Sequence, residues 1–225
     1  MKKLLFIVPI LFLLTACTNS ISPKSPSSGD TPQVPSINDT PISVSSTPKE
    51  NRTIPTPSYG SGKNLIEIFA DFQCPACQNF TKTFEPLLIE LANEGTIRIE
   101  YRQFPLPMHK NAYRDAMAAL CGAEQGKYME AKSAIYTLEI SKKESPVTDA
   151  NRVDTLSTIW IDTTDLKKCL DTDRYLAQVD SDIKLWESRR VNSTPTVFLD
   201  GKKIDNSLFR DPSTFKFNLQ RIMNP

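Results

Sequence analysis

The sequence predicts an α/β fold, and three stretches in the first half of the chain are the basis of this prediction. Residues 65–69 (LIEIF) are rich in β-branched and aromatic side chains, which is typical of a strand. Apolar residues then recur at spacings of three and four between Phe80 and Leu91, which predicts a helix with one apolar face. Residues 97–102 (IRIEYR) alternate like a half-buried strand. A strand, a helix and a strand in this order predict two parallel strands.

Two residues modify the predicted helix. Pro86 lacks a backbone N–H, and its ring crowds the preceding turn, so we predict a bend near it. Gly95 follows the last apolar position and is predicted to end the helix.

Between about residues 109 and 190 the apolar residues follow a helical period, so we predict a block of helices there. The patterns are Ala112, Ala116, Ala119, Leu120 and Ala123; Val153, Leu156, Ile159 and Trp160; and Tyr175, Val179, Ile183 and Trp186. Thr172 precedes the last pattern and is predicted to cap that helix.

Strand signals return after the helical block. Residues 196–199 (TVFL) predict a strand, and the Asp-Gly pair at 200–201 predicts a hairpin to a short strand at 202–204. The Asp-Pro pair at 211–212 predicts the capped start of a final helix. This order of elements resembles the thioredoxin fold with a helical insertion at about 109–190, so the predicted class is an α/β, thioredoxin-like fold.

Cys74 and Cys77 lie where the first predicted strand leads into the first helix. The first turn of a helix has unpaired N–H groups and the positive end of the helix dipole, and both stabilise a thiolate. Because a lowered cysteine pKa increases the fraction of nucleophilic thiolate, this placement favours thiol–disulfide exchange. We predict that Cys74 is the exposed, reactive sulfur and that Cys77 is its resolving partner.

Two other interpretations of the cysteine pair stay open. Half of a zinc site has the same spacing, although zinc takes about four ligands. The remaining cysteines, Cys17, Cys121 and Cys169, are scattered, and His109 is the only histidine. The second alternative is an inert structural disulfide. We expect neither a metal nor a cofactor.

The N-terminus predicts export. Residues 1–16 combine two lysines with an apolar run that is too short to span a bilayer, which predicts a signal peptide. The run ends in Leu-Thr-Ala-Cys, which resembles the bacterial lipobox, and this resemblance implies that Cys17 becomes a lipidated N-terminus. An ordinary signal peptide with a chance cysteine is the alternative. Several acyl chains would hold the protein at a membrane through a stable lipid anchor.

Residues 17–63 consist largely of Ser, Thr, Pro and Asn. Such a segment buries too little apolar surface to offset the entropy of ordering, so we predict a disordered tether after the lipidated cysteine. The folded domain is therefore expected at 64–225, which is long enough for one hydrophobic core.

Charge and compartment narrow the possible functions. The formal net charge is +1 and no long run of like charge occurs, so a nucleic-acid partner is not predicted. An exported compartment allows disulfides to persist, which favours a redox function for the cysteine pair.

Three stretches resemble the DsbA-like thiol–disulfide oxidoreductases, which are exported thioredoxin-fold proteins with an inserted helical domain. The stretches are Phe69 to Cys77 (FADFQCPAC); Phe104-Pro105-Leu106 with His109, Asn111, Ala112, Cys121 and residues 125–128 (QGKY); and Val191 to Thr196 (VNSTPT). The resemblance extends from about Asn64 to the C-terminus.

The resemblance implies a cis bond between Thr194 and Pro195 that faces the cysteine pair, with the Thr194 backbone pairing with an extended substrate peptide. An ordinary trans proline is the alternative. Some relatives have a second disulfide in the inserted domain, which implies that Cys121 and Cys169 pair, with two buried free thiols as the alternative. His109 matches the family pattern, but a structural role for this loop histidine is the expectation.

The chain departs from the family pattern at two positions. The strongly oxidising relatives have histidine just before the second cysteine, where this chain has Ala76. Relatives commonly have a buried acidic residue six positions before the first cysteine, where this chain has Ile68. The neighbouring Glu67 faces the opposite side of a strand and is not expected to substitute. We therefore expect a redox potential between about −270 and −120 mV.

These observations predict a membrane-tethered enzyme of the cell envelope that passes its Cys74–Cys77 disulfide to exported proteins. An integral-membrane redox partner would be needed to reoxidise the reduced pair. A disulfide reductase or isomerase with the same fold is one alternative. A lipoprotein that binds unfolded chains without catalysis is the other.

Overall fold

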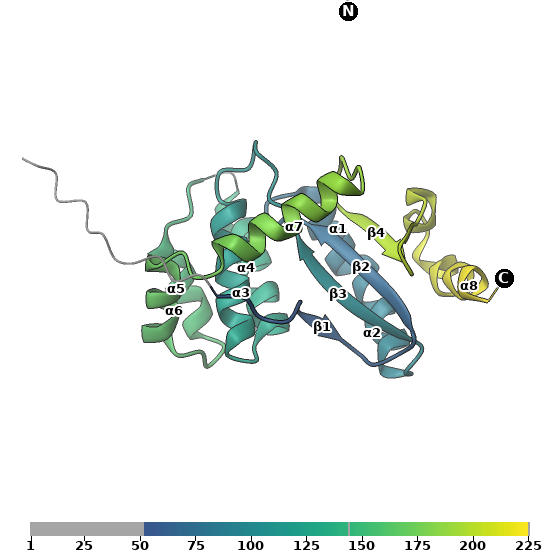
Figure 1. Cartoon of the computed structure of the whole chain (residues 1–225), viewed down its shortest axis with the longest axis horizontal. Coiled ribbons are helices and arrows are strands. Elements are labelled where there is room, and N and C mark those ends of the chain that lie inside the picture. The colour runs from purple at the N-terminus through teal and green to yellow at the C-terminus, as the bar shows by residue number, and fades with distance from the viewer. Residues whose placement is uncertain (1–51, 144, 225) are drawn as a thin grey trace, which may run out of the picture. The chain divides into compact units, whose positions relative to one another are not determined.

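The computed structural model describes residues 52–143 and 145–224 of the chain (Figure 1). The expected signal peptide at 1–16, the lipidated Cys17 and the expected tether as far as residue 51 lie outside the described residues. These three features stay predictions.

The described residues form an α/β fold around a five-stranded sheet in the order β1-β3-β2-β4-β5, so the predicted fold class is confirmed. At its centre, β2 (Asn64–Ala70) and β3 (Ile97–Gln103) run parallel. The connection between them comprises α1 (Pro75–Thr83) and α2 (Glu85–Asn93). The strand β4 (Thr196–Leu199) is antiparallel to β2, and β5 (Lys202–Lys203) pairs with β4.

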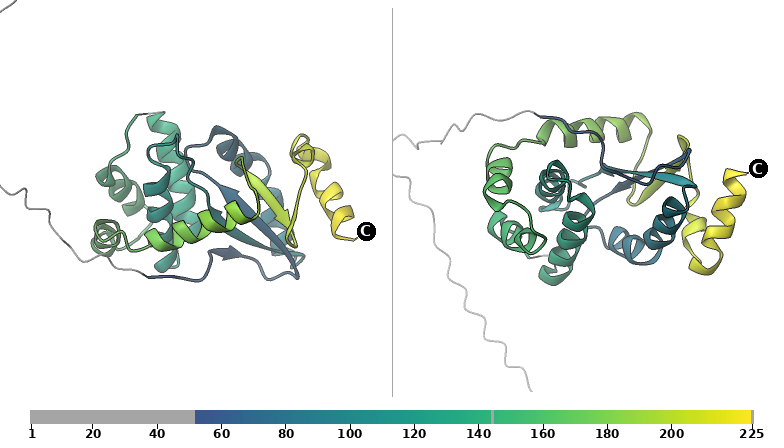
Figure 2. Two further views of the ribbon diagram at one scale, coloured as in Figure 1. Left: turned by 45° about the horizontal axis from the view of Figure 1, so that its top comes forward. Right: turned by 90° about the horizontal axis from the view of Figure 1, so that it is seen from below.

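Helices cover both faces of the sheet (Figure 2). On one face α1, α2 and the C-terminal α8 (Pro212–Met223) bury a core of aromatic and aliphatic side chains against β2, β3 and β4. Members of this core include Ile66, Phe80, Phe84, Leu88, Leu91, Ile97, Ile99, Phe215 and Leu219. On the other face α7 (Leu176–Ser188) packs its Trp186 ring on Phe104, with ring centroids 4.2 Å apart.

The helix predicted after Cys77 is two helices. The break falls at Phe84, two residues before Pro86. Because Pro86 has no N–H to donate to the preceding turn, α1 cannot continue through it, and the chain restarts as α2 with proline in its first turn. The predicted bend is therefore present as an interruption of the helix.

The helices of the insertion lie between β3 and β4, within the expected interval of 109–190. They are α3 (Ala112–Glu124), α4 (Tyr128–Lys142), α5 (Asp149–Ser157), α6 (Thr163–Asp171) and α7. Figure 1 shows α3 to α6 gathered beside the sheet, whereas α7 returns along it to β4.

Thr172 does not cap α7, so that prediction was wrong. It is the C-terminal cap of α6, and its hydroxyl donates to the Lys168 carbonyl. The chain needs a further turn through Asp173, at φ 49°, before α7 starts at Leu176. A threonine hydroxyl serves either end of a helix, so the sequence pattern did not distinguish the two positions.

The ordered chain starts before the expected boundary at Asn64. Ser58–Tyr59 form β1, antiparallel to the outer edge of β3. The Tyr59 hydroxyl donates to Asn93 over 2.9 Å, and the Gly62 N–H donates to the Ile97 carbonyl over 3.1 Å. The expectation that disorder extends to residue 63 is therefore corrected. Backbone hydrogen bonds hold these residues in place. The prediction of disorder considered only how little apolar surface the segment can bury, so it missed this pairing.

The strands and helix predicted after the insertion are present. Asp200 and Gly201 both have positive φ, at 48° and 75°, as the tight hairpin between β4 and β5 requires. A 3-10 helix, η1 (Asn206–Phe209), leads to α8. The Asp211 side chain accepts from the Ser213 N–H and caps α8, whose first residue is Pro212.

Cys121 of α3 and Cys169 of α6 form a disulfide in the core of the insertion, where each side chain is 1% exposed. We expect that replacing both cysteines by alanine lowers the free energy of unfolding by about 2–4 kcal/mol, because the bridge restricts the unfolded chain. Urea unfolding of the double variant measures the loss. An unchanged unfolding midpoint would contradict this prediction.

Within the described ranges, no helix combines the length and the apolar character needed to cross a bilayer.

Candidate active site

Cys74 and Cys77 lie at the start of α1, directly after β2. Cys74 is the N-cap residue with an extended backbone, and Pro75 follows as the first helical residue. This arrangement leaves the Cys74 sulfur beside the free N–H groups of the first turn. The Cys74 residue is 7% exposed and Cys77 is 1% exposed, so both are buried and the prediction of an exposed Cys74 was wrong, although Cys77 is the more deeply buried of the two.

Thr194 and Pro195 lie opposite this helix start, at the entrance to β4. The bond between them is cis, and the Cys74 sulfur lies 3.6 Å from the Thr194 carbonyl oxygen. A groove of about 260 Å³ adjoins this contact, and its apolar wall includes Phe80, Phe84 and Phe209. The structure thus brings together the four residues for which the sequence predicted catalysis and substrate binding.

The pKa of Cys74 is lowered to about 5. The hydrogen bond from the Cys77 thiol is the main cause, and it outweighs the opposing effect of burial. The buried Thr194 hydroxyl, which has no other partner among the described residues, and the backbone N–H groups of Ala76 and Cys77 also favour the thiolate. Although Ala76 replaces the histidine of strongly oxidising relatives, the thiolate is therefore still stabilised.

The pKa of Cys77 is shifted in the opposite direction, well above its ordinary value. Burial is the main cause, and the hydrogen bond to Cys74 and its negative charge add to it. At neutral pH the structure thus holds a Cys74 thiolate next to a protonated Cys77. These are the states that a nucleophile and a resolving thiol require.

We expect the reduced protein to show a thiolate absorbance transition with a midpoint near pH 5, assigned to Cys74. Because the thiol of the unfolded chain keeps its proton up to about pH 9, unfolding takes up a proton between these values. The stability of the reduced form should therefore rise with pH from about 5 to 9, by up to roughly 1.4 kcal/mol per unit, and be lost as pH falls through 5. A transition near pH 9 in the folded protein would contradict this.

Asp71 is a site residue for which the sequence analysis predicted no role. Its side chain is buried, and one carboxylate oxygen accepts from the Gln73 N–H over 2.7 Å and from the Cys74 N–H over 3.2 Å. The Asp71 N–H in turn lies 3.5 Å from the Cys77 sulfur. Asp71 therefore contacts both cysteines, one through its side chain and one through its backbone.

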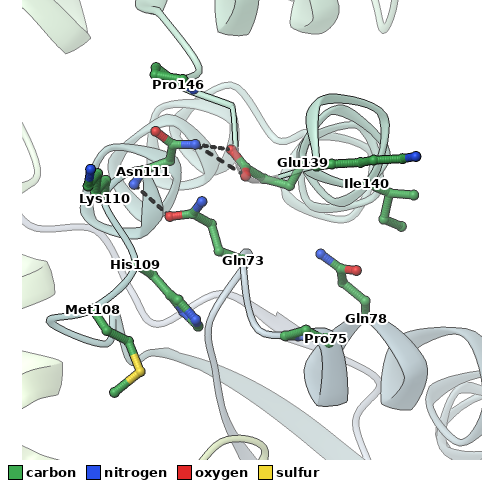
Figure 3. A pocket seen from close by; sticks show the side chains of 11 residues that line it. Gln73, Pro75, Gln78, Met108, His109, Lys110, Asn111, Glu139, Ile140 and Pro146 are labelled. Carbon is green, nitrogen blue, oxygen red and sulfur yellow. Dashed lines mark hydrogen bonds between the residues drawn. The ribbon is translucent and has the colours of Figure 1, made fainter. Parts of the chain in front are cut away.

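The loop before Cys74 is also fixed to the insertion. The Gln73 side chain accepts from the backbone N–H of Asn111 over 2.6 Å, and the Asn111 amide donates to Glu139 over 3.1 Å (Figure 3). These contacts form one wall of a cavity of about 670 Å³ that also borders Pro75 and His109. The segment between β3 and α3 thus positions the loop of the cysteine pair.

A buried ion pair lies on the Cys77 side of the site. Lys132 of α4 contacts both carboxylate oxygens of Glu85 in α2, at 2.7 and 2.5 Å, and the Tyr101 hydroxyl donates to Glu85 over 2.9 Å. Burial lowers the pKa of Lys132, and Glu85 and Cys77 oppose that shift. Since a Cys77 thiolate favours the charged lysine, the cation lies within electrostatic reach of the resolving sulfur.

The two positions at which the chain departs from the family pattern have different surroundings. Ile68 packs in the core under α1 and α2, so no carboxylate reaches the cysteines from that position. Glu67 faces the other side of the sheet and binds Arg189 over 2.5 Å. Glu85 supplies a buried acid to this region from a different element.

The zinc alternative gains no support from the described part of the chain. No group of three or more His, Cys, Asp or Glu residues there is arranged to hold a metal ion.

The family comparison decides the classification. The family model described as thioredoxin matches residues 55–215. The chain belongs to the thioredoxin family. The matched residues include the cysteine pair, the insertion and the cis-proline segment, so this thioredoxin-family chain contains its candidate site within the family region.

Solved structures show the same fold. MdbA from Actinomyces oris, a thiol–disulfide oxidoreductase, is 17% identical with a TM-score of 0.63 over 73% of this chain and 86% of that one. DsbA from Chlamydia trachomatis is 19% identical with a TM-score of 0.62 over 78% and 96%. BdbD from Bacillus subtilis is 20% identical with a TM-score of 0.57 over 79% and 98%. The expected DsbA-like fold is confirmed.

A sequence relative is the Na(+)/H(+) antiporter NhaA 1 of Mycolicibacterium gilvum strain PYR-GCK, which is 26% identical over 140 residues. The match covers 62% of this thioredoxin-family chain and 22% of the antiporter. The chain thus corresponds to about a fifth of the length of that relative.

Proposed function

We propose that the protein is an extracytoplasmic thiol–disulfide oxidoreductase that introduces disulfides into exported proteins through Cys74 and Cys77. The observation that supports this most directly is the opposite pKa shift of two neighbouring thiols, next to the Thr194 carbonyl. One thiol is held ready as a thiolate and the other as a protonated resolving group. An inert structural disulfide needs no such difference.

The reaction starts from a Cys74–Cys77 disulfide. A substrate thiolate attacks the Cys74 sulfur, the bond to Cys77 breaks, and Cys77 leaves as a thiolate that takes up a proton. A second substrate thiolate then attacks the substrate sulfur of the mixed disulfide and releases the Cys74 thiolate. The substrate loses two electrons, and the cysteine pair gains them.

The lowered pKa of Cys74 favours the oxidising direction. A thiolate that is stabilised in the reduced protein makes the reduced form more stable, so the disulfide form is the stronger oxidant. The names of the MdbA and DsbA structures agree with a redox function of this kind. A reductase or isomerase with this fold would be held reduced in the cell, so the thiol state of Cys74 and Cys77 in intact cells separates the two directions.

Substrate binding follows from the Thr194–Pro195 segment. The backbone next to the cis bond offers hydrogen-bonding groups that an extended chain can pair with, whatever its side chains are. The adjoining groove with Phe80, Phe84 and Phe209 would receive an apolar side chain of that chain. Such recognition suits exported proteins that have not yet folded.

The proposed location is the extracytoplasmic side of a membrane in the cell envelope. The support is the sequence pattern of residues 1–17, with Cys17 as the lipid anchor and the following segment as a tether. An integral-membrane redox partner would accept the two electrons and restore the disulfide. Labelling the cells with palmitate and comparing wild type with Cys17→Ala tests the anchor.

The decisive experiment measures exchange with a dithiol substrate. The purified protein, oxidised at Cys74 and Cys77, should oxidise a reduced two-cysteine peptide faster than the same concentration of glutathione disulfide does. A rate equal to that of glutathione disulfide would reject the proposed function. The remaining alternative would then be a protein that binds unfolded chains without catalysis, and Cys74→Ser should bind such chains as well as the wild type does.

A further inference from the structure

The Asp71 carboxylate is buried and has partners on both oxygens. One oxygen accepts from the N–H groups of Gln73 and Cys74. The other accepts from the Leu106 N–H over 2.7 Å and lies 2.9 Å from His109 Nδ1. The carboxylate therefore connects the loop before Cys74 with the segment between β3 and α3.

The surroundings of Asp71 assign the proton on His109. Three backbone N–H groups already donate to this carboxylate, so it acts as an acceptor on both oxygens. A carboxylate in this state has no hydrogen to give to a ring nitrogen, so His109 Nδ1 must carry the proton of the 2.9 Å contact. The imidazole is the only side chain among the described residues shown donating to Asp71.

The loop held by Asp71 donates to the Cys77 sulfur and fixes the backbone of Cys74. The Asp71 N–H lies 3.5 Å from the Cys77 sulfur, and the Cys74 N–H donates to the Asp71 carbonyl over 3.3 Å as well as to its carboxylate. Any shift of this carboxylate therefore moves the backbone around both cysteines. His109 lies outside the loop, with its side chain 21% exposed, and its side-chain contact with the loop among the described residues is the one to Asp71.

We propose that His109 is a positioning residue: through its hydrogen bond to Asp71 it holds the loop so that the Asp71 N–H meets the Cys77 sulfur and the Cys74 backbone keeps its place at the start of α1. This inference rests on the proposed function and deepens it, because it names a residue outside the cysteine motif that sets the redox balance of the pair. From the sequence alone we expected a structural role for this loop histidine.

The direction of the effect follows from two causes that act together. Without the imidazole, the Asp71 carboxylate has one donor fewer and its negative charge is less compensated beside the Cys74 thiolate. The loop that leads to Cys74 is also held less firmly, so the sulfur is less well placed beside the Ala76 and Cys77 N–H groups that stabilise the thiolate. Both causes raise the pKa of Cys74 and destabilise the reduced form.

The test compares His109→Leu, which removes the donor, with His109→Asn, whose amide nitrogen takes nearly the position of Nδ1. Met108→Gln is the matched control, because Met108 is the preceding loop residue and is 75% exposed. For each full-length protein we measure the thiolate absorbance titration and the equilibrium with reduced and oxidised glutathione. Both readouts report on the cysteine pair without any protein substrate.

We expect His109→Leu to raise the midpoint of the Cys74 titration by about one pH unit. With the midpoint near 5, a rise to 6 shifts the glutathione equilibrium at pH 7 about tenfold toward the oxidised protein, which corresponds to about 30 mV. His109→Asn should restore most of the wild-type values, and Met108→Gln should leave both unchanged.

Three outcomes would overturn the inference: an unchanged midpoint in His109→Leu, an equal shift in His109→Asn, or an equal shift in Met108→Gln. If His109→Leu does not fold, His109→Gln replaces it, because its longer side chain carries the amide past Asp71. Failure of the proposed function gives a different result. The wild type would then not oxidise a dithiol peptide, whereas the Cys74 titration would still change in His109→Leu.

Discussion

Replacing Cys74 by serine should reduce the rate of dithiol oxidation to the uncatalysed rate, a loss on the order of a thousandfold or more. This variant cannot form the Cys74–Cys77 disulfide, so it has neither a sulfur for the substrate thiolate to attack nor an acceptor for the two electrons. Stopped-flow measurement of peptide oxidation gives the rates.

Cys77→Ser is the matched variant, and its expected behaviour is different. The Cys74 thiolate is still present and attacks a substrate disulfide, but no second protein thiol can resolve the product. Covalent complexes should therefore accumulate, visible as bands on a non-reducing gel that disappear with a reductant. Activity retained in Cys74→Ser, or an absence of complexes in Cys77→Ser, would speak for the binding protein without catalysis.

Replacing Lys132 by methionine should lower the free energy of unfolding by about 3–5 kcal/mol. Both members of the Glu85–Lys132 pair are buried, with side chains 3% and 7% exposed. The single replacement leaves the Glu85 carboxylate inside the protein with the Tyr101 hydroxyl as its remaining partner among the hydrogen bonds of the described residues. Urea unfolding at neutral pH measures the loss.

The double variant Glu85→Gln with Lys132→Met should recover a large part of this stability, because no unpaired charge is then buried. The exposed pair Lys167–Asp171 in α6 is the control, and Lys167→Met should change stability by less than about 0.5 kcal/mol. If Lys132→Met and Lys167→Met lower the free energy of unfolding by the same amount, burial does not determine the strength of the Glu85–Lys132 pair.

Local patterns in the sequence were sufficient to predict the central elements of the fold. The period of two in 97–102, the helical period after Cys77 and the Asp-Gly pair at 200–201 each reflect a local requirement of a strand, helix or turn. The pairing of Ser58–Tyr59 with β3 was missed because it depends on a strand distant in sequence. Thr172 was assigned to the wrong helix because its hydroxyl can serve either terminus.

The candidate site also contains residues that local sequence predicts and residues that only the tertiary packing brings together. The cysteine pair and the Thr194–Pro195 segment are recognisable because their residues are consecutive in sequence. Lys132 and Glu85 come from α4 and α2, and only the packing of the insertion on the sheet brings them together near Cys77. Asp71 was inside a recognised motif, but its link to His109 depends on the course of the chain after β3.

The strands at the two margins of the sheet have a consequence for self-association. A protein that exposes main-chain groups to unfolded polypeptides risks polymerising with copies of itself through its own sheet. Here one edge strand is the two-residue Ser58–Tyr59, and the other is Lys202–Lys203. The two lysine side chains are exposed and cationic. Short edge strands and repelling lysines disfavour such association, so concentrated solutions of the protein should stay free of fibrils while the proposed substrate contact at Thr194 stays accessible.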